Sequence, residues 1–228
     1  MRTLAAVAIS CLLLVQLANG LPVGKLRTTA AAAKVQDNPQ LSGETSMEED
    51  SDAQTPIVLF IIGELGKLAK WVLERGSVVV NNAVTELKAI PDKDELLQAN
   101  ITRMSRVATE AAQFKFQDDE ESILKLFENM ITFADMMSDY DSMPENSKLK
   151  LTLKAALENN GYNQFDNEFQ QKVVNLAEKF ETDFGEYFKG LTAEEKLKSA
   201  KLLQWYEEFK AETNEERKLD KFGEFFDF

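Results

Sequence analysis

The sequence feature that most constrains the fold is an aromatic stripe in the segment 163–190. Apolar side chains recur there at intervals of four and three residues: Phe165, Phe169, Val173, Leu176, Phe180, Phe184 and Tyr187. This spacing places them on one face of an α-helix and leaves the charged residues mostly on the other faces. Such a helix must bury its stripe, so we expect the other elements to be helices that cover it.

The same periodicity continues on both sides of this segment. We expect a first helix from Thr55, an N-cap, and Pro56 to about residue 90, with a kink or a break near Gly76-Ser77 and an end at Pro91. Later helices are predicted from caps and charged first turns at Asp92, Asp118-Asp119, Asn146 or Ser147, Thr192 and Thr213, with left-handed glycine ends at Gly161 and Gly190. The short connections favour antiparallel neighbours.

The N-terminus has the pattern of a secretory signal peptide over residues 1–20. Arg2 precedes an apolar stretch at 4–17, and Ala18 and Gly20 fit a cleavage site. The only cysteine, Cys11, lies in this segment, so the mature chain would have no disulfide. Residues 21–55 are acidic and poor in bulky apolar side chains, which predicts a disordered leader. The sequence thus predicts a secreted, extracellular protein.

No strand alternation or hairpin signal interrupts the helical pattern. The predicted fold class is all-α: a single bundle of roughly six or seven amphipathic helices over 56–228, after the disordered acidic leader. The formal charge of −13 argues against nucleic acid as a partner, because that binding depends on cationic residues. No stretch after the signal peptide is long and apolar enough to predict a stable membrane span.

The composition argues against most catalytic chemistry. The chain has no histidine and no cysteine besides Cys11, which removes the usual nucleophilic and zinc sites. A calcium loop starting at Asp139 would need an oxygen ligand, a glycine and a glutamate where the chain has Met143, Pro144 and Lys150. We therefore expect no catalytic residues, no bound metal and no cofactor.

Binding remains as the mode of action, with three groups of candidate residues. Residues of the stripe could line an apolar ligand site, although a filled core is the simpler interpretation: Phe165, Phe169, Phe180, Phe184 and Tyr187. The terminal residues Phe225, Phe226 and Phe228 either close the bundle or form a surface for a protein partner. Asn100 begins an N-glycosylation sequon.

One short segment, after the aromatic stripe, is similar to part of the nematode fatty-acid- and retinol-binding proteins: residues 188–195, Phe-Lys-Gly-Leu-Thr-Ala-Glu-Glu. Insect apolipophorin III, a secreted bundle of amphipathic helices, offers an architectural analogy. The resemblance covers these residues alone and assigns no family. It implies an extracellular carrier of lipids or other apolar ligands.

The leading hypothesis is a secreted, non-enzymatic helical bundle that binds a protein partner or an apolar ligand, and the lipid carrier is an alternative. A membrane-active or signalling factor that uses the helix 57–75 is a further alternative, because residues 57–62 are apolar on all faces. A central buried helix explains this run more simply.

Overall fold

The structure is a computed structural model that describes residues 51–117 and 119–225. The predicted signal peptide, Cys11, nearly all of the predicted leader, Phe226 and Phe228 lie outside these residues. Across the described ranges every regular element is a helix, which confirms the predicted all-α bundle. The helices are α2 (Ser51–Lys88), α3 (Glu95–Gln113), α4 (Glu120–Ser142), α5 (Lys148–Asn159), α6 (Tyr162–Gly190), α7 (Ala193–Lys198), α8 (Ala200–Ala211) and α9 (Glu215–Glu224).

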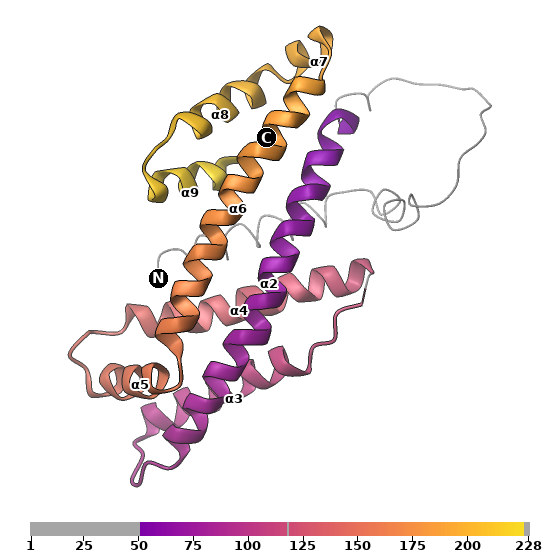
Figure 1. The fold of residues 1–228 in the computed structure, drawn as a ribbon. Helices are drawn as coiled ribbons and strands as arrows, with labels where there is room; N and C mark the ends of the chain where they lie inside the picture. Colours follow the sequence, from indigo (N-terminus) through magenta and orange to yellow (C-terminus); the bar gives the residue numbers. More distant parts are fainter. Residues whose placement is uncertain (1–50, 118, 226–228) are drawn as a thin grey trace.

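The two longest helices, α2 and α6, run side by side in opposite directions (Figure 1). Helices α3 and α5 lie against the C-terminal part of α2 and α4 crosses its middle, while α8 and α9 lie against the C-terminal part of α6 (Figure 1). Helices α7 and α8 meet at Ser199, so they count as one bent helix or as two. Counted as one, they bring the described bundle within the predicted number of helices.

Helix α2 continues through Gly76, so the predicted break is wrong. A Cβ atom at this position would lie 2.5 Å from Cζ of Phe133 in α4. Glycine is needed here because the ring of Phe133 packs directly on the helix backbone. The helix also begins at Ser51, before the predicted N-cap Thr55, so Pro56 lies inside its second turn.

Several helix starts agree with the predicted caps. The side chains of Asp119 and Ser147 accept hydrogen bonds from the backbone N–H groups of Ser122 and Lys150. Thr192 forms a complete capping box with Glu195, as predicted. Gly161 has a φ of 92°, which confirms the predicted left-handed end of α5.

Three predicted helix ends are wrong by a few residues. Asp92 takes a φ of 51° in the turn after α2, so Asp94 caps α3 instead and accepts a hydrogen bond from the N–H of Leu97. The side chain of Asn214, rather than Thr213, accepts from the N–H of Arg217 at the start of α9. Gly190 remains helical, and the chain leaves α6 at Leu191 in an extended conformation.

Candidate functional site

The aromatic stripe of α6 contributes residues to two separate groups of rings. Its N-terminal half carries Tyr162, Phe165 and Phe169, which pack with rings from α2 and α4. The ring of Phe165 stacks on Trp71 of α2 with centroids 5.4 Å apart, and it meets Phe133 of α4 edge-on at 6.5 Å. We call this set the central aromatic group: Trp71, Phe133, Tyr140, Tyr162, Phe165 and Phe169.

The C-terminal half of α6 packs against α8 and α9 through a denser set of rings. Phe180 lies at its centre and is fully buried, with the ring of Phe222 4.8 Å away and that of Phe209 5.4 Å away. We call this set the C-terminal aromatic cluster: Phe180, Phe184, Tyr187, Phe188, Trp205, Tyr206, Phe209, Phe222 and Phe225.

The residues predicted to line an apolar site divide between the two groups: Phe165 and Phe169 belong to the central aromatic group, and Phe180, Phe184 and Tyr187 belong to the C-terminal aromatic cluster. Phe165, Phe169, Phe180 and Phe184 are buried, whereas Tyr187 is only half-buried. Phe188 is the buried residue at the end of the stripe, and its position one turn after Phe184 could have identified it. Phe225 lies inside the cluster against Phe180, rather than on an exposed surface.

The polar atoms of the cluster bond to backbone carbonyls. The hydroxyl of Tyr206 donates to the carbonyl of Glu181 at 2.8 Å, and the indole N–H of Trp205 donates to the carbonyl of Lys221 at 3.0 Å. Burial raises the pKa of Tyr206 above its ordinary value, so this hydroxyl stays protonated at neutral pH. These bonds orient two large rings inside an otherwise apolar site.

Ion pairs hold α9 at the edge of the cluster. Lys218 pairs with Glu181 of α6 at 2.6 Å, and Lys221 pairs with Glu208 of α8 at 3.0 Å. The Lys218–Glu181 pair joins α9 to α6 directly. The pair between Lys221 and Glu208 joins α9 to α8, so these two helices are connected to each other as well as to α6.

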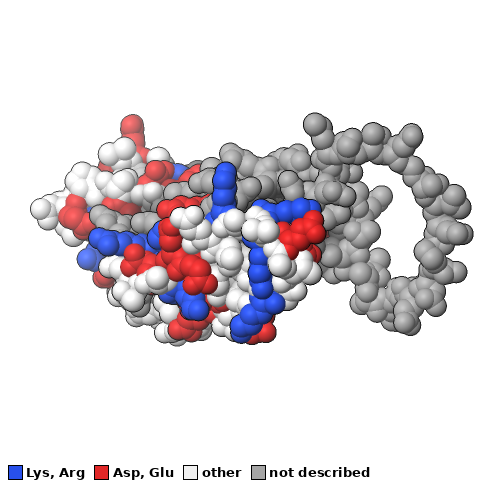
Figure 2. Space-filling model, turned by 90° about the horizontal axis from the view of Figure 1, so that it is seen from above, with Lys and Arg blue, Asp and Glu red and all other residues white. Residues whose placement is uncertain are grey.

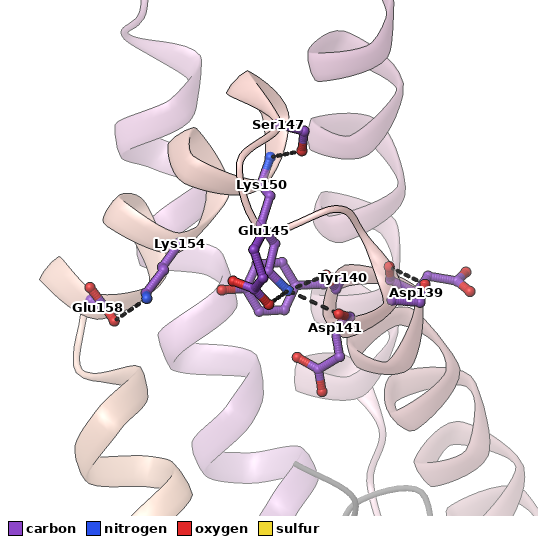
Figure 3. Close-up of polar contacts among 9 residues, drawn as sticks. Asp139, Tyr140, Asp141, Glu145, Ser147, Lys150, Lys154 and Glu158 are labelled. Atoms are coloured by element: carbon purple, nitrogen blue, oxygen red, sulfur yellow. Dashed lines mark hydrogen bonds and ion pairs between the residues drawn. The ribbon is translucent and has the colours of Figure 1, made fainter.

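A buried lysine, Lys150 of α5, organises the end of α4 (Figure 3). The side chain of Lys150 is 2% exposed, and its amine donates to the carbonyls of Tyr140 at 2.6 Å and Asp141 at 3.2 Å. The amine also lies 3.9 Å from the centre of the Tyr140 ring. A cation at the C-terminal end of a helix satisfies carbonyls that lack helical partners. Lys150 is therefore a structural cap, which the sequence pattern did not identify.

Glu145 pairs with this lysine at 4.0 Å, and two further carboxylates lie near this end of α4. Asp141 of α4 and Asp166 of α6 each have a buried oxygen with no hydrogen-bond partner in the described part of the chain. Burial raises the pKa of Asp141, Lys150 opposes that change, and Asp166 adds to it. Asp139, where the failed calcium loop would begin, instead pairs with Arg103 of α3. Within 51–117 and 119–225, no group of acidic residues is arranged to hold a metal ion.

The predicted glycosylation site lies on a helix. Asn100 is part of α3, and its side-chain N–H group donates to the carbonyl of Leu96 at 2.9 Å. It borders a cavity of about 10 Å³ between α3, α4 and α5, which has room for about one water molecule and none for a ligand. Glycosylation at Asn100 stays a prediction.

From residue 60 onward, where burial is described, most apolar residues of the 57–75 helix face the protein core. Ile61, Leu65 and Val72 are buried, as expected for a central helix. In the described ranges no helix is long and apolar enough to cross a membrane. No known protein family matches this chain, and no curated protein and no solved structure is significantly similar to it.

Proposed function

We propose that this is a secreted, non-enzymatic protein that acts by binding an apolar ligand, and that the ligand enters the C-terminal aromatic cluster. The observation that carries the proposal is the composition of this cluster. Three helices meet there almost entirely through aromatic rings, with centroids between 4.8 and 6.3 Å apart. Rings present large apolar areas and few directional bonds, so they accept an apolar molecule without leaving polar groups unpaired.

The attachment of α8 and α9 supports ligand entry at this point. These are short helices, and besides the ring contacts they are joined to α6 by the ion pair of Lys218 and the hydrogen bond of Tyr206. A ligand would separate some rings and replace their contacts with its own. Burial of apolar ligand area, worth about 25 cal/mol per Å², offsets the lost ring contacts.

The buried polar groups favour binding over catalysis. Lys150, Tyr206 and Trp205 each bond to backbone carbonyls, and each bond has a structural purpose. The buried face of α2 favours this carrier function over a membrane-active role for the 57–75 helix, because that helix would have to leave the core to reach a membrane.

The two tryptophans of the chain allow a direct test. Trp71 lies in the central aromatic group and Trp205 in the C-terminal aromatic cluster. With Trp71→Phe, titration with oleate should change the fluorescence of Trp205; with Trp205→Phe, the signal of Trp71 should stay constant. Mass spectrometry of the protein purified from secreting cells should find an apolar ligand at stoichiometric amounts. A protein without ligand, and a Trp205 signal unmoved by oleate, would contradict the proposal.

A further inference from the structure

Helix α7 (Ala193–Lys198) stands at one end of the bundle and buries none of its own side chains (Figure 1). Its capping box holds it in place: the backbone N–H of Thr192 donates to the Glu195 carboxylate at 2.7 Å, and the N–H of Glu195 donates to the Thr192 hydroxyl at 3.3 Å. The helix is therefore formed by local bonds rather than by core packing. Ala193, Glu194, Leu197 and Lys198 are exposed to an outside surface, and Glu195 and Lys196 are half-buried.

The side chain of Leu197 is 78% exposed, more than any other large apolar side chain of the described residues. Ala193, one turn earlier on α7, is exposed as well. A single exposed leucine is ordinary on a protein surface. What distinguishes Leu197 is the charge around it.

The stretch around Leu197 is slightly positive in an otherwise acidic chain: four lysines and three glutamates give residues 186–201 a net charge of +1. Lys198 pairs with Glu194 at 3.5 Å, and Lys189 pairs with Glu186 at 2.9 Å. Lys196 and Lys201 have no ion pair among the residues that the structure describes, while Glu195 keeps its negative charge within the capping box. Figure 2, viewed from this end, shows lysine and arginine side chains beside uncharged surface, with acidic groups among them.

We propose that α7 docks on an anionic lipid surface, with Leu197 entering the headgroup region and Lys196 and Lys201 meeting lipid phosphates. Each basic residue near such a surface adds attraction, and an inserted apolar side chain adds burial. The remaining surface of this acidic chain is repelled, which orients the protein with α7 toward the membrane. A lipid surface fits better than a protein partner, because α7 offers a single projecting leucine rather than a broad apolar patch.

The test is vesicle co-sedimentation of the full protein, expressed with its own N-terminus in secreting cells and used as the cells process it. Vesicles of phosphatidylcholine alone are compared with vesicles that contain about 30% phosphatidylserine. The protein should bind the anionic vesicles, and binding should weaken at high salt. Leu197→Glu should lower the partition coefficient about tenfold, and the double variant Lys196→Glu/Lys201→Glu by at least about tenfold.

The matched control is Leu96→Glu. Leu96 is also an exposed leucine, 67% exposed in the first turn of α3, but that helix lies at the other end of the molecule and starts with Asp94 and Glu95 (Figure 1). This variant should bind as the unchanged protein does. Equal loss in both leucine variants, equal binding to neutral vesicles, or no vesicle binding would each overturn the proposal. It stands apart from the apolar-ligand function, since α7 can dock whether or not the aromatic cluster holds a ligand.

Discussion

The hydroxyl of Tyr206 occupies the space that a side chain at position 185 would need. A Cβ atom added to Gly185 would lie 2.7 Å from this hydroxyl oxygen, which donates to the carbonyl of Glu181 one turn earlier in α6. Helices α6 and α8 therefore approach closely at a point where one of them has no side chain. This contact fixes the position of the Tyr206 ring within the C-terminal aromatic cluster.

Gly185→Ala should lower the free energy of unfolding by about 1–3 kcal/mol, because the added methyl group overpacks the contact with Tyr206. Tyr206→Phe should cost about 1 kcal/mol through the lost hydrogen bond. On that background the alanine no longer meets a hydroxyl, so it should be neutral or stabilising by up to about 1 kcal/mol. Urea denaturation of the unchanged protein, the two single variants and the double variant measures the coupling energy between the two residues.

The control for this cycle is Gly63→Ala in α2, where nothing lies within 4 Å of the added Cβ. It should stabilise the protein by about 0.5–1 kcal/mol, through helix propensity alone. Additive effects of Gly185→Ala and Tyr206→Phe would show that the two residues do not meet in solution.

The ion pairs of Glu64 form a link between α2 and α6 that we expect to be sensitive to acid. Its carboxylate accepts from Lys67 at 2.6 Å and from Lys179 of α6 at 2.7 Å, and its side chain is 15% exposed. Burial alone would raise the pKa of Glu64, but these hydrogen bonds lower it below its ordinary value of 4.5. A lowered pKa in the folded state contributes stability above the unfolded pKa, and this is lost as the pH falls through the folded value.

Glu64→Gln should therefore lower the free energy of unfolding by about 1 kcal/mol at neutral pH. The difference from the unchanged protein should shrink as the pH falls below 4.5. Denaturation curves at a series of pH values measure it. The control is Glu74→Gln, whose exposed pair with Lys70 at 3.9 Å should contribute little at any pH. A constant difference across the acid range would argue against the link.

Local signals in the sequence were enough to predict the helices and about half of their caps. The stripe of α6 and the capping box at Thr192 depend on residues a few positions apart, so periodicity and residue type identify them. The break expected at Gly76 was wrong because the reason for that glycine lies in another helix, at Phe133. Propensity cannot distinguish a glycine that bends a helix from one that admits a distant ring.

The candidate site was predictable only in part, for the same physical reason. Periodicity identified Phe180 and Phe184, but it could not show that the stripe divides between two groups of rings. That division depends on where α8 and α9 return to α6, which is a long-range property. The capping role of Lys150 could not be predicted from the sequence pattern either, because its partners are backbone carbonyls of the preceding helix.

Lys150→Met should lower the free energy of unfolding by about 1–3 kcal/mol. Methionine keeps the apolar stem, but the carbonyls of Tyr140 and Asp141 lose their buried donor. Thermal and urea denaturation measure the loss. Lys154→Met is the matched control on the same helix, since Lys154 is half-exposed and only pairs with Glu158 at 3.9 Å. Its effect should stay within about 0.5 kcal/mol, and equal effects would contradict the role of Lys150 as a cap.

Phe225→Ala should loosen α8 and α9 without loosening the central aromatic group. Phe225 is buried against Phe180, Phe184 and Trp205, and it follows the last helical turn of α9. Removing a buried phenylalanine costs about 3–5 kcal/mol in a rigid core, and less near a chain end that can open locally. Hydrogen exchange should therefore quicken in α8 and α9 and stay slow in α2 and α4. The emission of Trp205 should shift to longer wavelength while that of Trp71 is unchanged. Exchange that quickens equally in all helices would mean that the two groups of rings form one cooperative core.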